Sequence, residues 1–385
     1  MSVFNLARVS ARIILSGQMR RFHIRTYGGS PKDICRSIVE ACYDSKKKYF
    51  RTSVDTYPEL WTRDFGRCVP ALINAGYRDE VVNTYRFAFD AFQKSGRYEL
   101  TILPDGQLYN FPFGTYSPDG YAFFLYGLCA LDDESIIDDN SVFLAQESQR
   151  FFRLTVNPSD GTVKTNVHFS EAQDYLRRNS SCYTTCCCFI VQQALAKLGI
   201  ANPLTNFDYP LILKERYYSD AHGYFYDDMF KRHFVSGDAN ILPFWSGAVS
   251  RQPFGCVDDI LIPVLDNIEK SQLNMPYPTR YRNGTEKLPS LRLDRINPWQ
   301  TSSVWTCLGI HYLEMLYLYA PHHFTGELNR FVELIDRLRC FPEVVSHKTK
   351  TLYRYPLYVS ETSMLWAANL LNLLQDNPRV VHEHF

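Results

Sequence analysis

The sequence predicts an all-α fold built from helical hairpins, and three observations support this prediction. Apolar residues recur every three and four positions, as in "VVNTYRFAFDAF" and "CYTTCCCFIVQQALAKLG", which is the period of a helix with one buried face. Asn and Gly mark the ends of several such segments, as in "INAGYRDE" and "KLGIANP". Short links alternate with long links that are rich in Pro, Gly and aromatic residues.

Pairing consecutive periodic segments gives six helical hairpins. We expect helices at residues 31–47, 64–76, 79–95, 119–131, 140–153, 180–198, 206–219, 238–250, 257–269, 301–319, 324–339 and 360–374. No low-complexity linker divides the sequence, and it contains neither a dinucleotide-binding glycine fingerprint nor a P-loop. Nor does it show the constant repeat of a plain helical solenoid. We therefore expect one domain over residues 31–385, with a ligand at the long links.

The bulk composition is that of a globular protein with an ample core. The 385 residues carry a formal net charge of zero, and 45% of them are hydrophobic. Zero net charge disfavours nucleic acid and acidic membranes as partners, and no apolar run reaches the roughly 18 residues that span a bilayer. Aromatic residues reach 15%, mainly to fill the core, although flat rings also cover the apolar faces of sugars.

The cysteines indicate reduced thiols rather than a disulfide scaffold. There are 11 of them, an odd number, and Cys186, Cys187 and Cys188 are consecutive, so we expect a cytoplasmic protein. Cys182 and Cys186 stand four residues apart on an expected helix, but no C-x-x-C or nearby His completes a metal site. We expect neither a metal nor a cofactor.

The first 30 residues form a basic segment that we treat separately from the hairpins. They contain Arg8, Arg12, Arg20, Arg21 and Arg25 and no acidic residue. This is the composition of a transit peptide, which would send the protein to mitochondria or another organelle. A solvated basic arm explains the same composition, and both interpretations remain open.

The segment "YPELWTRDFG" gathers a Tyr, a Trp, an Arg and an Asp at the start of an expected helix. Asp64 lies near the first turn, where the helix dipole stabilises a carboxylate. Arg63 and Asp64 offer paired donors and acceptors for adjacent sugar hydroxyls, while Tyr57 and Trp61 offer ring surface. The alternative is a helix cap with a surface ion pair.

Two further segments deliver carboxylates to helix starts. "TYSPDGYAFFLYGL" brings Asp119 and Gly120 to an apolar helix, unless Asp119 is only its cap. "FSEAQDYLRRNSSCY" has Asp174 with Arg177 and Arg178 just ahead of a core helix. An Asp near Arg usually forms a salt bridge, whereas a general acid needs burial that raises its pKa.

Another pair of segments lies near the end of the chain. "FPEVV" places Glu343 in a loop after an apolar helix, and "SMLWAANLL" follows it with a Trp-containing helix. "NPWQTSSVWTCLGIHYLEML" places Trp299, Gln300 and Trp305 at the start of another helix. A single Glu in a loop is usually just solvated. Glu343 is therefore a candidate catalytic residue only in combination with the other segments.

The order of these segments resembles the six-hairpin (α/α)6 toroid glycoside hydrolases. These are the glucoamylases, the trehalases and relatives that include processing α-glucosidase and mannosylglycerate hydrolase. The glucoamylases bind the terminal sugar with a W-x-R-D segment, and "WTRDFG" matches it. Their catalytic base lies in a loop about twenty residues before a W-S-x-A helix, and "FPEVV…SMLWAANLL" reproduces that spacing around Glu343. Their N-x-G-x-x-W-P helix is similar to the segment with Asn297, Gln300 and Trp305.

The catalytic acid follows a second pattern. The glucoamylase W-E-E pair is replaced by Arg177 and Arg178 ahead of "NSSCYTT". Trehalases use E-S-G-W-D-x-S-x-R with Asp as the acid, and "SEAQDYLRR" fits this frame with Asp174 as acid, although Gln173 replaces the Trp. The trehalase signatures P-G-G-R-F and Q-W-D-x-P are absent, so trehalose is not implied.

The resemblance therefore implies one (α/α)6 toroid and an inverting, exo-acting glycoside hydrolase. Asp174 would be its acid and Glu343 its base. Substrate-binding residues would be Tyr57, Trp61, Arg63, Asp64, Asp119, Gly120, Arg177, Arg178, Trp299, Gln300 and Trp305. The implied substrate is an α-linked glucoside or mannoside, with no metal required.

Two alternatives belong to other classes. A non-catalytic carbohydrate-binding relative would keep the aromatic pocket without a competent acid, and the two arginines favour it. A terpene-cyclase-type α-toroid is suggested by "LDDESIIDDN", but its spacing fits neither D-D-x-x-D nor D-x-D-D, so an acidic helix terminus explains it better. In the preferred interpretation, the motif loops meet at one mouth of the ring, with Asp64 and Glu343 at the same end.

Overall fold

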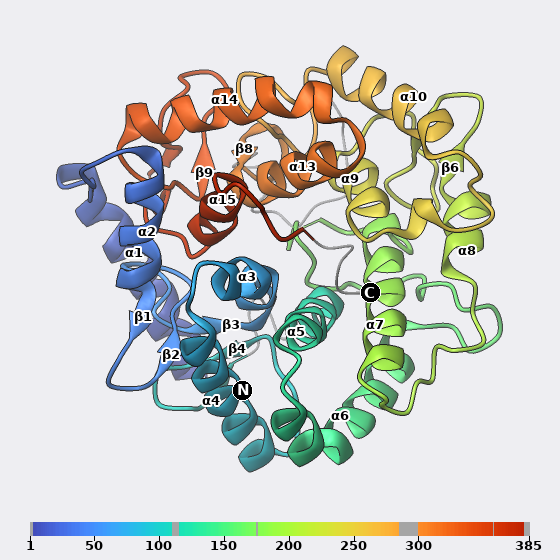
Figure 1. Cartoon of the computed structure of the whole chain (residues 1–385), viewed down its shortest axis with the longest axis horizontal. Coiled ribbons are helices and arrows are strands. Elements are labelled where there is room, and N and C mark those ends of the chain that lie inside the picture. Colours follow the sequence, from blue (N-terminus) through green and yellow to red (C-terminus); the bar gives the residue numbers. More distant parts are fainter. Residues whose placement is uncertain (1–2, 110–114, 175, 285–298, 357, 381–385) are drawn as a thin grey trace.

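Six helices form a closed inner ring in the computed structural model, which describes residues 3–109, 115–174, 176–284, 299–356 and 358–380. Each inner helix contacts the next one, and the last contacts the first, so the ring closes (Figure 1). The inner helices are α3 (Thr62–Asn74), α5 (Pro118–Leu131), α7 (Cys182–Lys197), α9 (Gly237–Trp245), α13 (Thr306–Tyr319) and α15 (Ala367–Leu373). The all-α toroid expected from the sequence is confirmed.

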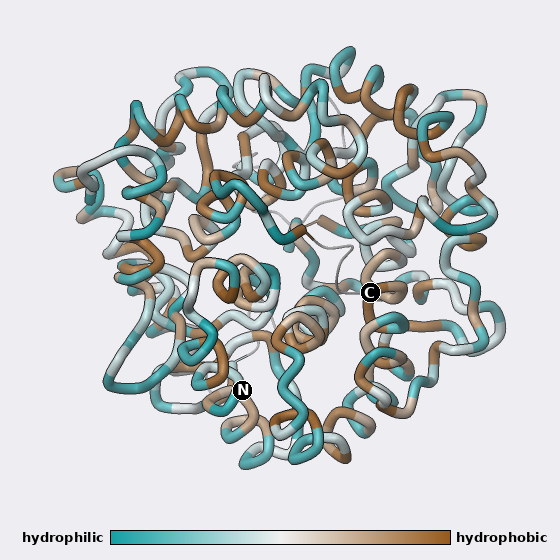
Figure 2. The backbone as a smooth tube through the Cα atoms, viewed as in Figure 1, coloured by the Kyte–Doolittle hydropathy of each residue, from teal (hydrophilic) through white to brown (hydrophobic). Residues whose placement is uncertain are grey.

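An outer helix precedes each inner one and completes a hairpin with it (Figure 1). The outer helices are α2 (Pro31–Cys42), α4 (Arg78–Ser95), α6 (Glu134–Thr155), α8 (Tyr209–Arg216), α10 (Val257–Lys270) and α14 (Pro321–Leu338). Hydrophilic and hydrophobic residues alternate along α10 and α14 (Figure 2), as expected for helices with one face in water. Additional short helices are α12 (Trp299–Ser302) and the 3-10 turn η1 (Ala248–Ser250).

The inner helices are deeply buried, and two glycines allow two of them to meet backbone to backbone. Every residue of α5 is buried. A Cβ on Gly66 of α3 would lie only 2.1 Å from the carbonyl oxygen of Phe123 in α5. A Cβ on Gly127 of α5 would lie 2.8 Å from the carbonyl oxygen of Gly66. Any larger residue would therefore push α3 and α5 apart.

Two-residue antiparallel strands tie the loops together at the helix ends. β1 (Tyr43–Asp44) pairs with β2 (Tyr49–Phe50), β6 (Tyr218–Ser219) with β7 (Tyr224–Phe225), and β10 (Arg354–Tyr355) with β11 (Tyr358–Val359). β4 (Thr101–Ile102) lies between β3 (Leu60–Trp61) and β5 (Leu108–Tyr109). β8 (Val304–Trp305) pairs with β9 (Val344–Val345) and sets Trp305 opposite Val344. This last pairing fixes the residue that follows Glu343.

Each expected helix has a counterpart, although several boundaries were wrong. Residues 43–47 leave the helix for the β1–β2 hairpin, in which Asp44 accepts hydrogen bonds from the backbone N–H groups of Lys46 and Lys47. The last expected helix begins at Ala367, because residues 360–363 form backbone bonds with neighbouring loops instead. Local hairpin hydrogen bonds replaced helical ones at the first place, and bonds to distant loops replaced them at the second.

The basic N-terminal segment contains a further helix, α1 (Val3–Phe22), which the periodicity did not predict. Arg20 is buried and pairs with Glu361 at 3.1 Å. Arg12 pairs with Glu59, and Arg25 pairs with Asp55 at 2.9 Å. Carboxylates of the ring therefore hold this basic segment. No helix in the described part of the chain is long and apolar enough to cross a membrane.

Candidate active site

A cavity of about 430 Å³ opens at the N-terminal ends of the inner helices. Arg63 and Asp64 come from the first turn of α3, Trp305 precedes α13, and Trp366 precedes α15. Its aromatic lining consists of Tyr57, Trp61, Tyr281, Trp299, Trp305, Tyr355, Tyr358 and Trp366. Its charged lining consists of Arg63, Asp64, Arg67, Asp174 and Glu343. Flat rings around a few charged groups suit a sugar, which has apolar faces and polar edges.

The rings form a wall of two packed groups. Trp299 lies 5.3 Å from Trp305 and 4.8 Å from Tyr358, measured between ring centroids. Tyr57 meets Trp61 edge to face at 5.8 Å. Ring-to-ring packing of this kind holds each ring in one orientation, so the wall is shaped before any ligand arrives.

Arg63 connects three segments of the site. Its Nη1 lies 3.0 Å from Asp119 Oδ2 and 3.6 Å from Asp174 Oδ1, and it donates to the Glu171 carbonyl at 2.8 Å. Asp64 Oδ1 accepts a hydrogen bond from Trp366 Nε1 at 2.8 Å. Burial raises the pKa of Asp64, and the positive charge of Arg63 opposes that shift. Arg63 and Asp64 are both buried, so these contacts are not the surface ion pair of the alternative interpretation.

Asp174 lies at the edge of the cavity in the loop before α7, with 15% of its side chain exposed. Ser170 Oγ donates to its Oδ1 at 2.7 Å. Burial raises the pKa of Asp174, while Arg63 and the bond from Ser170 lower it. The arginine next to this carboxyl is therefore Arg63, not Arg177 or Arg178 as the sequence suggested.

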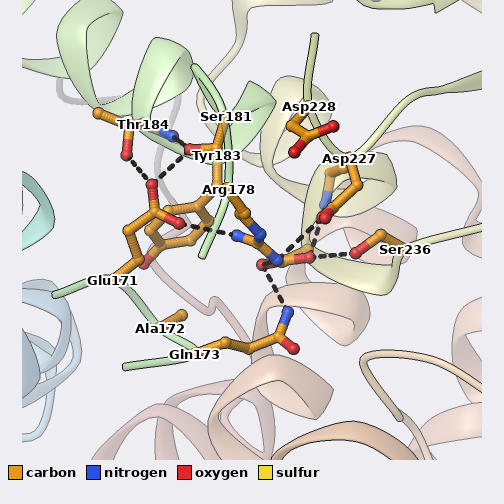
Figure 3. A network of polar contacts seen from close by, with 12 residues as sticks. Glu171, Ala172, Gln173, Arg178, Ser181, Tyr183, Thr184, Asp227, Asp228 and Ser236 are labelled. Carbon is orange, nitrogen blue, oxygen red and sulfur yellow. Dashed lines mark hydrogen bonds and ion pairs between the residues drawn. The ribbon is translucent and has the colours of Figure 1, made fainter. Parts of the chain in front are cut away.

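Arg178, in the same loop, is buried in a network of polar contacts (Figure 3). Its Nη1 is 3.1 Å from Glu171 Oε2, and its Nη2 is 2.9 Å from Asp227 Oδ1 and 2.7 Å from Asp238 Oδ2. Ser181 and Thr184 at the start of α7 donate to Glu171 Oε1.

Gln173 ties the loop to the same network. Its Nε2 donates to Asp238 Oδ2 at 3.3 Å, and its Oε1 accepts from Arg282 Nη2 at 3.0 Å (Figure 3 shows the first of these bonds). The loop before Asp174 is thus held at Glu171 and at Gln173. Such fixation limits the orientations that the Asp174 side chain can adopt.

Glu343 also lines the cavity, from the loop between α14 and β9, and is 6% exposed. Tyr358 donates to its Oε2 at 2.5 Å, and Tyr57 lies 3.3 Å from both of its oxygens. Burial raises the pKa of Glu343 to about 7, with Tyr358 lowering it and the nearby Glu361 raising it further. Arg20 of α1, which pairs with Glu361, lowers it.

The structure brings most of the predicted site residues together. Those that line the cavity are Tyr57, Trp61, Arg63, Asp64, Asp174, Trp299, Trp305 and Glu343. Asp64 and Glu343 thus share one end of the ring. The roles of these residues stay predictions.

Five predicted residues do not line the cavity: Asp119, Gly120, Arg177, Arg178 and Gln300. Asp119 is buried behind the wall, where it binds Arg63 and accepts from Tyr183 at 3.1 Å. Gly120 packs so closely that a Cβ would lie 2.5 Å from the Tyr98 hydroxyl. Arg177 is exposed, and Gln300 is buried. Asn297, at the start of the segment that resembles the N-x-G-x-x-W-P helix, lies outside the described residues.

Sequence reasoning missed several lining residues, among them Arg67, Tyr281, Tyr355 and Tyr358. The aromatic run "YRYPLYV" was the available signal for the two tyrosines of the β10–β11 hairpin. Arg67 follows Arg63 by one helical turn and shares its face. Among the described residues, no group of at least 3 His, Cys, Asp or Glu side chains gathers as metal ligands would.

Comparison with known proteins identifies the fold. No family model matches the sequence, and no curated protein matches it. A GH63 mannosylglycerate hydrolase from Thermus thermophilus, solved with glucose, matches with a TM-score of 0.62 at 11% identity, over 87% of this chain and 97% of that one. A wild-type glycosidase matches at 0.58 and 12% identity, over 96% and 97%. A rhamnosidase from Klebsiella oxytoca with bound rhamnose matches at 0.59 and 12% identity, over 90% and 64%.

The chain therefore has the six-hairpin (α/α)6 toroid fold of glycoside hydrolases. Its solved structural relatives include the GH63 mannosylglycerate hydrolase, which agrees with the resemblance seen in the sequence. At these identities the likeness concerns the fold, so the chemistry has to be argued from the site itself.

Proposed function

We propose that this protein is an inverting, exo-acting glycoside hydrolase that releases a terminal α-linked glucose or mannose. The observation that carries the proposal is a cavity walled by aromatic rings, whose largely buried carboxyls include Asp174 and Glu343 beside Asp64. Hydrolysis of a glycoside with a pair of carboxyls requires such an arrangement. The glucose bound to the Thermus relative supports a hexose.

Asp174 is the proposed general acid, which protonates the glycosidic oxygen as the bond breaks. A general acid needs a pKa raised toward the working pH, and burial shifts the pKa of Asp174 in that direction. Arg63 at 3.6 Å opposes this shift. A bound sugar that displaces water from the cavity would strengthen the effect of burial.

Glu343 is the proposed general base, which takes a proton from a water molecule on the opposite face of the sugar. Inverting enzymes keep their two carboxyls about 6.5–9.5 Å apart to leave room for that water. Two tyrosine hydroxyls, from Tyr57 and Tyr358, contact Glu343 and hold its carboxylate in place. The proposed chemistry needs no cofactor.

A leaving-group comparison tests the acid. Asp174→Asn should lose activity severely on glycosides with poor leaving groups and much less on nitrophenyl glycosides, because an activated aryl group leaves with little protonation. Asp160→Asn, which changes a carboxylate in the loop between α6 and α7, is the matched control. Equal losses on both substrate types, or no loss, would assign the acid to a group other than Asp174.

A carbohydrate-binding protein without turnover is the second candidate. The observation in its favour is Arg63, whose charge stabilises the ionised form of Asp174 that cannot donate a proton. Comparing the wild type with Glu343→Gln separates the two functions. Hydrolysis by the wild type alone supports the enzyme, whereas sugar binding by both proteins without hydrolysis by either supports the binding protein.

A further inference from the structure

The N-terminal helix α1 contacts the two segments whose tyrosines, Tyr358 and Tyr57, contact Glu343. On one side, Gln18 donates to the Pro356 carbonyl at 2.7 Å, and a Cβ on Gly17 would lie 3.2 Å from the backbone nitrogen of Val359. On the other side, Arg12 Nε donates to the Thr56 carbonyl at 3.1 Å. Tyr358 lies in the first segment and Tyr57 follows the second. The helix is therefore built into the rim of the active site.

One face of α1 lines the cavity, through Ser10, Ile13 and Ile14. This spacing places the three side chains on the same side of a helix. Ile13 also packs with Val9 and Leu103 in a small hydrophobic cluster that anchors the helix.

The cavity has an inner end and a mouth. Asp64 is 5% exposed, whereas Ile14 is 37% exposed, so α1 lies at the mouth. In the proposed function, Asp64 and Arg63 bind the terminal sugar at the inner end. The group attached to that sugar, the aglycone, then lies toward the mouth and meets α1.

The two basic side chains of the described lining, Arg63 and Arg67, are buried, and the partly exposed charged group is the carboxyl of Asp174. The other described side chains at the mouth, Ser10, Ile13, Ile14, Trp299 and Tyr355, are uncharged. Arg12 and Arg20 of α1 bind the carboxylates of Glu59 and Glu361 and the Thr56 carbonyl instead. Within the described part of the lining, an anionic aglycone would find no cation at the mouth, while an apolar one would find two isoleucines and two rings.

We propose that α1 forms the aglycone subsite and selects neutral glycosides with a compact apolar aglycone. The direction of the substrate rests on the proposed function, but the apolar subsite itself can be tested without turnover. Transferring apolar surface from water to Ile14 is favourable in proportion to the area covered. Affinity should therefore rise from a methyl to a phenyl aglycone by about tenfold.

The test compares Ile14→Glu with Leu15→Glu in a Glu343→Gln background, which prevents turnover. Leu15 is the next residue of the same helix and is 64% exposed, and it does not line the cavity. Dissociation constants are measured by calorimetry for methyl and phenyl α-glucosides and α-mannosides. Ile14→Glu should remove most of the phenyl preference and leave methyl glycosides nearly unaffected, while Leu15→Glu should keep the preference.

The outcomes separate this proposal from the proposed function. A phenyl preference that survives Ile14→Glu, or equal weakening of methyl and phenyl glycosides, overturns the subsite on α1. An Ile14-dependent preference in a chain whose wild type hydrolyses no glycoside supports the subsite and overturns only the hydrolase. Hydrolysis without any phenyl preference supports the hydrolase and overturns only the subsite.

Discussion

Asp64 is buried at the inner end of the cavity, next to Arg63 in the chain and bonded to Trp366. Asp64→Asn should lower kcat/KM by about tenfold to a hundredfold, because a charge-assisted hydrogen bond to a sugar hydroxyl contributes about 1.5–3 kcal/mol. Steady-state kinetics on a nitrophenyl glycoside measure the effect. Asp133→Asn, at the N-cap of α6, should leave the kinetics unchanged. Unchanged kinetics in Asp64→Asn would show that Asp64 does not bind the substrate and has only a structural role.

Glu343 carries a pKa raised to about 7, so the activity of the wild type should depend on pH near neutrality. A general base works when it is ionised, and kcat/KM should therefore fall as pH decreases through about 7. Tyr358→Phe removes a hydrogen bond that lowers this pKa. The acidic limb of the profile should then move upward by about one pH unit.

Tyr355→Phe is the matched control for this pH profile. Tyr355 lies on the paired strand of the same hairpin and also lines the cavity, but it forms none of the hydrogen bonds described for Glu343. Its substitution should leave the acidic limb in place. An unmoved limb in Tyr358→Phe would show that a group other than Glu343 titrates.

The loop before α7 is an element whose shape depends on one arginine. Arg178 forms ion pairs with Glu171, Asp227 and Asp238, and Figure 3 labels the first two of these partners. Arg178→Met would leave three buried carboxylates without their shared cation, so the free energy of unfolding should drop by about 3–5 kcal/mol. Urea denaturation measures the change.

The neighbouring Arg177 supplies the control for that element, since it is exposed. Arg177→Met should change the free energy of unfolding by no more than about 0.5 kcal/mol. If both substitutions cost the same, the network in Figure 3 does not stabilise the loop.

The whole ring depends on close contact between its inner helices. Gly66→Ala would place a Cβ 2.1 Å from the Phe123 carbonyl oxygen, so α3 and α5 must separate, at a cost of about 1–3 kcal/mol in the free energy of unfolding. Gly326→Ala, on the exposed face of the outer helix α14 where no atom lies within 4 Å, should instead stabilise by about 0.5–1 kcal/mol. Thermal denaturation of both variants should show opposite shifts. A stable Gly66→Ala protein would contradict this packing.

Much of the fold could be predicted because each helix depends on residues that are close together in the sequence. Apolar residues at helical spacing and Asn or Gly at segment ends located the hairpins from 31 onward. Boundaries failed where backbone groups found distant partners, as at residues 360–363. The helix α1 was missed because its basic composition resembled a targeting segment, and its carboxylate partners lie far along the chain, for instance Glu361 for Arg20.

The sequence by itself determined the all-α class, the hairpin order and the clustering of Trp, Arg, Asp and Glu at helix starts, because each depends on residues close together in the chain. Only the tertiary structure decided which charges meet. It placed Arg63 rather than Arg178 beside Asp174, and it brought Tyr358 to Glu343. It also set α1 at the mouth of the cavity. These contacts, and the burial that raises the pKa of both candidate carboxyls, arise only when the ring closes and excludes water.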